Sequence, residues 1–85
     1  MYEYAEDALE RRAPYREDHL ALIAKWNSDG KLPIAGALGD PPHAGFIAFD
    51  VEDPQEIEAF TSADPYVEAG IVTSHRIEPW TVVTP

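Results

Sequence analysis

The sequence contains no cysteine, which excludes disulfide bonds, thiolate metal sites and cysteine nucleophiles. It also lacks any run of about 18 apolar residues, the length that a membrane-spanning helix needs. Its first seven residues, Met1 to Asp7, carry neither the basic segment nor the apolar core of a signal peptide. These absences predict a cytoplasmic protein that does not contact membranes.

Basic residues are scarce, because six Lys and Arg stand against 16 Asp and Glu, and the formal net charge is -10. Such a chain repels phosphate backbones and anionic lipid surfaces, so nucleic acid is not an expected partner. Nucleotide transfer and serine hydrolysis lack their motifs, since there is no glycine-rich phosphate loop, no dinucleotide fingerprint and no Gly-x-Ser-x-Gly elbow. The three histidines, His19, His43 and His75, show no metal-binding spacing, so neither a metal nor a cofactor is expected.

The residues that are present are those of a folded protein. Hydrophobic residues make up 45% of the 85 residues and charged residues 26%, close to the usual globular share. Residues 1–85 are therefore predicted to form a single domain. A domain of this size has a thin core, and association with a second copy would bury further surface, so we expect a homodimer.

Six elements are predicted along the chain. Pro14 and Gly30 are typical of the start and the end of a helix. The buried stripe of this helix is expected to consist of Leu20, Ile23, Ala24 and Asn27, with Leu22 and Trp26 beside it. Asp53-Pro54-Gln55-Glu56 is typical of a helix start with a capping box. The order is strand, helix, strand, strand, helix, strand, over residues 2–4, 14–29, 32–38, 45–51, 54–62 and 71–83, with the last strand the longest and bent at Pro79.

This order matches the split unit of ferredoxin-like folds, an α+β architecture with a mostly antiparallel sheet. The strands over 32–38 and 45–51 are expected to be adjacent and antiparallel. Both helices should cover one face of the sheet, and the other face would expose aromatic and aliphatic side chains. Pairing two such sheets face to face would remove that exposure.

Several segments of the chain resemble the YciI-like (YCII-related) domain family. They are Arg12-Ala13-Pro14-Tyr15-Arg16-Glu17-Asp18-His19-Leu20, Gly30-Lys31-Leu32, Ala35-Gly36-Ala37, and Ala63-Asp64-Pro65-Tyr66 with Gly70. The resemblance implies a dimeric α/β barrel with a cleft in each protomer, where His19 and Asp64 face one another as the active-site pair. It also implies dehydrochlorinase-type elimination on a muconate-like acid, although most members of the family have no established reaction. Haem, which related barrels bind through a helix histidine, is a minor alternative for so short a chain.

One departure from the family concerns the first strand. The family usually begins with a longer hydrophobic strand, whereas only Tyr2 to Tyr4 precede Ala5 here. Either the assigned start truncates the strand or the strand is short. A short strand forms few ladder hydrogen bonds, so stability would suffer before chemistry does.

His19 and Asp64 each have an ordinary structural interpretation beside the functional one. His19 lies where the polar start of its helix meets the apolar face, which is typical of a partly exposed histidine with one satisfied hydrogen bond. Alternatively, a carboxylate orients its imidazole for proton transfer near neutral pH. Asp64 precedes Pro65 and is a good N-cap for a turn that ends at Gly70. The two roles of Asp64 are compatible, since one oxygen can cap while the other accepts from an imidazole.

Four further residues are candidates for binding a substrate. Arg16, together with Arg12, could bind a carboxylate or phosphate; the alternative for Arg16 is a surface ion pair with Glu17 or Asp18. Tyr66 is expected to contact the ligand, or else to pack with its hydroxyl in water. Gly36, inside a strand, indicates either a bulge or a ligand close to the backbone.

Together these features predict a lyase or isomerase that uses His19 and Asp64 for proton transfer on a small organic acid. In this hypothesis Arg16 holds a substrate carboxylate beside a developing enolate. The alternative is a module of the same fold that binds a metabolite or supports an assembly without catalysis.

Overall fold

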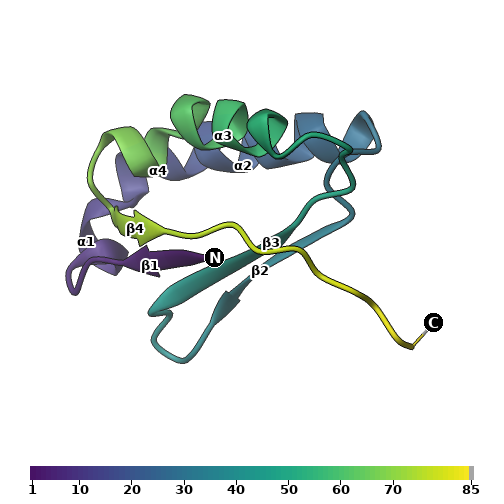
Figure 1. Ribbon diagram of the computed structural model, residues 1–85. Helices are drawn as coiled ribbons and strands as arrows, with labels where there is room; N and C mark the ends of the chain where they lie inside the picture. Colours follow the sequence, from purple (N-terminus) through teal and green to yellow (C-terminus); the bar gives the residue numbers. More distant parts are fainter. Residues whose placement is uncertain (85) are drawn as a thin grey trace.

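A computed structural model describes residues 1–84 and contains four strands and four helices within them. The elements are β1 (Tyr2–Tyr4), α1 (Ala8–Arg11), α2 (Ala13–Ser28), β2 (Ile34–Leu38), β3 (Ala44–Ala48), α3 (Pro54–Ala63), α4 (Pro65–Glu68) and β4 (Val72–His75). The strands form one antiparallel sheet in the order β2-β3-β1-β4, and α2 and α3 cover one of its faces (Figure 1). The predicted α+β architecture is confirmed, although the short α1 was not predicted.

The long helix α2 agrees with its prediction to within one residue at each end. It ends because Gly30 adopts a left-handed conformation, with a φ of 76°. The amide of Lys31 then donates to the carbonyl of Trp26 over 3.0 Å, a closing hydrogen bond of the Schellman type. This local stop redirects the chain toward β2.

The buried side of α2 differs from the predicted stripe of Leu20, Ile23, Ala24 and Asn27. Leu20, Ala24 and Asn27 are exposed. The side toward the core carries residues spaced by three and four, namely His19, Leu22, Ile23 and Trp26. The stripe is therefore rotated by about one residue from its predicted position, which places His19 on the inner side.

The cap of α3 is also simpler than predicted. The Asp53 carboxylate accepts a hydrogen bond from the amide of Gln55 over 2.9 Å, which confirms the cap. The Glu56 carboxylate accepts from the ammonium group of Lys31 over 3.1 Å instead of completing a capping box. The predicted box is therefore wrong, because the long basic side chain of Lys31, from the loop between α2 and β2, binds the same carboxylate.

The hairpin of β2 and β3 forms as predicted. Its five residue pairs run from Ile34 opposite Ala48 to Leu38 opposite Ala44 without a shift in register. A bulge at Gly36, one of the two expectations for this glycine, is therefore wrong.

The predicted long strand over 71–83 is wrong. Strand β4 ends at His75, and the chain beyond it is irregular up to residue 84. Pro79 has no amide hydrogen for a ladder, and sequence propensity cannot show that no further strand lies beside this segment. The segment instead crosses the sheet (Figure 1). The Trp80 ring packs edge-on against Phe46, with centroids 5.3 Å apart.

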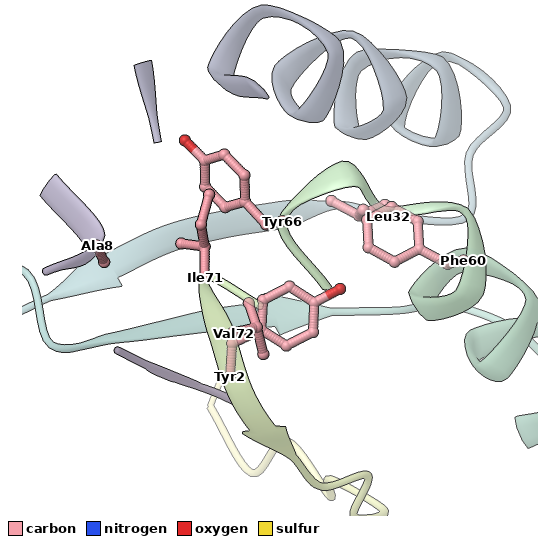
Figure 2. Packing of buried hydrophobic residues seen from close by; sticks show 7 residues of the cluster. All are labelled: Tyr2, Ala8, Leu32, Phe60, Tyr66, Ile71 and Val72. Carbon is pink, nitrogen blue, oxygen red and sulfur yellow. The ribbon is translucent and has the colours of Figure 1, made fainter. Parts of the chain in front are cut away.

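The core lies between the sheet and the helices. Its buried cluster consists of Tyr2, Ala8, Leu32, Phe60, Tyr66, Ile71 and Val72 (Figure 2). Two of these residues, Tyr2 and Tyr66, carry a polar hydroxyl into an otherwise apolar layer. Within residues 1–84, no helix has both the length and the apolar character to cross a membrane.

Candidate active site

His19 is the one residue of α2 that is fully buried, with 6% of its surface exposed. The expectation of a partly exposed border position is therefore wrong. Its imidazole stacks on the ring of Tyr66, with centroids 3.7 Å apart and planes only 4° from parallel. This stacking covers one face of the imidazole and fixes its plane.

Asp64 lies at the junction of α3 and α4 and is completely buried. Its Oδ1 accepts the amide of Tyr66 over 2.9 Å, which confirms the predicted cap. The same Oδ1 lies 2.8 Å from Nδ1 of His19, so the fold joins two residues that are 45 positions apart. The division of labour differs from the prediction, because one oxygen performs both roles.

The second oxygen of Asp64 binds a residue that the sequence reasoning missed. The hydroxyl of Tyr2, in β1, donates to Oδ2 over 2.9 Å. Burial, and next the nearby Asp64 carboxylate, raise the pKa of Tyr2, so the phenol stays protonated and remains a donor. The sequence carries only a weak signal for this contact: a tyrosine in a strand needs a partner for its hydroxyl if the strand is buried.

These contacts determine which nitrogen of His19 carries the proton. The ionised Asp64 carboxylate only accepts hydrogen bonds, so Nδ1 of the neutral imidazole must be the donor. Nε2 then holds a lone pair, and it makes no hydrogen bond to any of residues 1–84. An imidazole held in this way is ready to accept a proton at Nε2.

His19 borders a cleft with a volume of about 230 Å³. This volume is below the range typical of pockets for drug-sized ligands, so the cleft suits a small ligand. Its lining residues come from β1, α2, the β2–β3 hairpin and the segments before α2 and after α3: Tyr2, Tyr4, Arg12, Arg16, His19, Leu20, Ile23, Ala35, Gly36, Ala37, Gly45, Ile47 and Tyr66. Every predicted site residue is among them except Asp64, which lies buried behind His19.

The two arginines give the cleft a charge opposite to that of the whole chain. Arg12 and Arg16 form no salt bridge within residues 1–84, whereas Arg11, Lys31 and Arg76 each pair with a carboxylate. The ion pair considered for Arg16 is therefore not formed. None of the acidic residues lines the cleft. A cavity with two unpaired guanidinium groups and no carboxylate on its walls favours an anion.

The two remaining candidates for substrate binding, Tyr66 and Gly36, border the cleft in different ways. Tyr66 borders the cleft but is 4% exposed and stacked on His19, so it supports the imidazole as well as facing the cleft. Burial raises the pKa of its phenol. Gly36 contributes backbone to the cleft, and a Cβ added there would meet no atom within 4 Å. Lack of space at the backbone therefore does not explain this glycine.

Metal ligands are not gathered at this site or elsewhere in the described part of the chain. Residues 1–84 contain no group of three or more His, Asp or Glu side chains placed to hold a metal ion. The groups around the cleft are instead suited to two other tasks: the two arginines can hold an anion, and the His19 imidazole can accept a proton.

Known proteins share both the sequence and the fold of this chain. The YCII-related domain matches residues 1–81. Protein YciI of Escherichia coli is 33% identical over 83 residues, which cover 87% of this chain and 85% of that protein. An uncharacterised protein of Haemophilus influenzae is 34% identical over 89 residues, with 91% of each chain covered.

A solved structure has the same fold at lower sequence identity. The 5-chloro-2-hydroxyhydroquinone dehydrochlorinase of Burkholderia phenoliruptrix, in complex with 2,5-dihydroxybenzoquinone, superposes with a TM-score of 0.77 and 22% identity. The match covers 94% of this chain and 88% of that one. At this identity the likeness establishes the ferredoxin-like fold.

Proposed function

The chain belongs to the YCII-related domain family, and we propose that it is an enzyme that transfers a proton on a small organic acid, with His19 as the base. The observation that carries this proposal is the 2.8 Å hydrogen bond between Nδ1 of His19 and the buried Asp64 carboxylate at the wall of the cleft. It leaves Nε2 as the free basic nitrogen of a fixed imidazole.

In the proposed mechanism, Nε2 of His19 removes a proton from a carbon next to the substrate's carboxylate or other electron-withdrawing group. The electron pair of the broken C–H bond forms an enolate. Asp64 holds the Nδ1 proton and stabilises the imidazolium. Arg12 and Arg16 lie unpaired at the same cleft and stabilise the negative charge of the substrate and of the enolate.

Two outcomes are possible for the enolate. If a leaving group sits on the adjacent carbon, it departs as an anion and a double bond forms, which is the reaction of a lyase or dehydrochlorinase. If no leaving group is present, the imidazolium returns the proton to another carbon, which is isomerisation. The dehydrochlorinase with this fold supports the first outcome as the one to test first.

The cleft also limits the substrate. Two arginines select an anion, and the aliphatic side chains on the walls, Leu20, Ile23, Ala35, Ala37 and Ile47, select an apolar body. A volume of about 230 Å³ admits a small molecule only. We therefore propose small carboxylic acids with an activated C–H bond, halogenated acids included.

The test is a panel of such acids in deuterated water, with C–H exchange and halide release followed by NMR and ion chromatography. For an acid that reacts, His19→Gln should lower kcat by about 10² to 10⁴-fold, the usual contribution of a general base, with little change in affinity. Arg16→Gln should weaken binding by about tenfold or more, since it removes a charged hydrogen-bond donor. His43→Gln, at an exposed histidine outside the cleft, is the matched control and should keep full activity.

The competing non-catalytic role gives a different result in the same experiment. A binding module would bind an acid from the panel, lose that affinity in Arg16→Gln, and show neither exchange nor elimination in the wild type. Binding without any turnover across the panel would contradict the proton-transfer proposal.

We also propose that the protein works as a homodimer that pairs through the sheet face opposite the helices. This face exposes Ile34 and Leu38, and Trp80 lies on it against Phe46. Exposed apolar side chains gathered on one face are typical of a surface that binds a partner. Sedimentation at micromolar concentration should give twice the chain mass of 9.4 kDa, and Ile34→Glu should shift it to the monomer. A wild type that sediments as a monomer would rule this arrangement out.

A further inference from the structure

The Asp64 carboxylate has two oxygens with different partners, and one of them depends on a single side chain. Oδ1 receives the amide of Tyr66 and the imidazole of His19, whereas Oδ2 receives only the hydroxyl of Tyr2. We infer that Tyr2 is a positioning residue that locks the Asp64 carboxylate in the orientation in which it holds His19. The inference rests on the proposed function of the His19–Asp64 pair and adds a third member to it.

Because Asp64 is buried, its Oδ2 depends on the Tyr2 hydroxyl as a hydrogen-bond donor. Asp64 has no exposed surface, so water cannot readily replace a lost donor. A buried carboxylate oxygen without a partner is costly. Without the hydroxyl of Tyr2, nothing holds Oδ2, and rotation of the carboxylate would lengthen the hydrogen bond from His19.

The position of Tyr2 in the sheet keeps its hydroxyl in place. Strand β1 is central, between β3 and β4, and Tyr2 is paired with Gly45 on one side and His75 on the other. Its ring packs edge-on against His75, with centroids 6.5 Å apart, and only 4% of the residue is exposed. A side chain confined in this way cannot follow a carboxylate that rotates, so Tyr2 constrains Asp64 and not the reverse.

Tyr4 provides the matched control. It lies two residues along the same strand, lines the same cleft and is half-buried, but its hydroxyl makes no hydrogen bond within residues 1–84. Tyr2→Phe and Tyr4→Phe therefore each remove one hydroxyl from neighbouring positions of β1. Only the first removes a donor to Asp64.

The experiment follows the Nδ1 proton of His19 in the full ¹⁵N-labelled chain by NMR and needs no substrate. In the wild type this proton should exchange slowly with water, because it is buried and hydrogen-bonded. In Tyr2→Phe its exchange should accelerate by about tenfold or more beyond any loss of protection at the core amides of β1 and β4. Tyr4→Phe should retain the wild-type rate.

Two results would overturn the inference. One is an unchanged Nδ1 exchange rate in Tyr2→Phe; the other is acceleration in step with the core amides, which would mean that Tyr2 contributes to stability alone. If Tyr2→Phe does not fold, the wild type still decides, since the hydroxyl proton of Tyr2 must be visible and show a nuclear Overhauser effect to the Nδ1 proton. An acid panel without turnover would remove the proposed function and leave this result intact, so the two failures are distinguishable.

Discussion

At the scale of single residues, the same atoms of Asp64 serve both the fold and the proposed chemistry. Its Oδ1 caps α4 and also holds His19, so a substitution there changes helix stability together with any activity. Asp64→Asn is for this reason a poor test of mechanism. His19→Gln separates them, because it removes the imidazole and leaves the hydrogen bond from the Tyr66 amide that caps α4.

Two glycines in the hairpin give a residue-scale prediction because they differ in the space around them. A Cβ at Gly45 would lie 2.7 Å from the hydroxyl oxygen of Tyr4, whereas a Cβ at Gly36 would meet no atom within 4 Å. Gly45→Ala should therefore destabilise the protein by about 1 to 3 kcal/mol through overpacking. Gly36→Ala should be neutral or stabilise by up to about 1 kcal/mol, since alanine loses less backbone entropy in a strand.

Urea unfolding of the two glycine variants checks this prediction. By strand alternation, a side chain at Gly36 would lie on the same face as its partner Phe46, away from the helices, so Gly36→Ala should also leave the cleft unchanged. Equal free energies of unfolding for the two variants would contradict the prediction and show that the Tyr4 side chain moves aside without loss of stability.

At the scale of elements, the accuracy of prediction depends on whether the determining signal is local. Helices α2 and α3 were predicted because glycine and Asp-Pro signals at their ends act within a few residues. The cap at Asp64 followed for the same reason. The end of β4 was not predicted, because a strand continues only where a neighbouring strand offers partners, and that is decided by the whole sheet.

The site shows the same division between local and non-local signals. His19, Arg12 and Arg16 share one helical side, and the sequence could place them together. The hydrogen bond from Tyr2 to Asp64 joins residues that are 62 positions apart, and no spacing rule predicts it. Tyr2, the site residue that the sequence analysis missed, is therefore found only from the tertiary structure.

At the scale of the whole molecule, the uneven distribution of charge is the main property. The chain carries a net charge of -10, yet its cleft is lined by two unpaired arginines and no acid. The general negative field repels anions at long range, and it is screened beyond about 8 Å at physiological salt. In the proposed function, selection of an acid therefore depends on short-range contacts inside the cleft.

The buried phenols of Tyr2 and Tyr66 make the stability of the whole molecule sensitive to alkaline pH. Burial is the largest cause that raises the pKa of each phenol in the folded state. In the unfolded chain both phenols lose their protons near pH 10. Above that pH the unfolded state binds fewer protons than the folded state, so the free energy of unfolding falls as pH rises.

Urea unfolding between pH 8 and pH 11.5 should therefore show a plateau up to about pH 10 and then a decline, to which each phenol contributes up to about 1.4 kcal/mol per pH unit. Tyr2→Phe should lower the plateau, because it removes the hydrogen bond to Asp64, and should also make the decline shallower. Tyr15→Phe, at a tyrosine that is 40% exposed, is the control and should leave the decline unchanged. A decline of equal steepness in the wild type and Tyr2→Phe would mean that the Tyr2 phenol ionises as readily in the folded protein as in the unfolded chain, which its burial beside a carboxylate opposes.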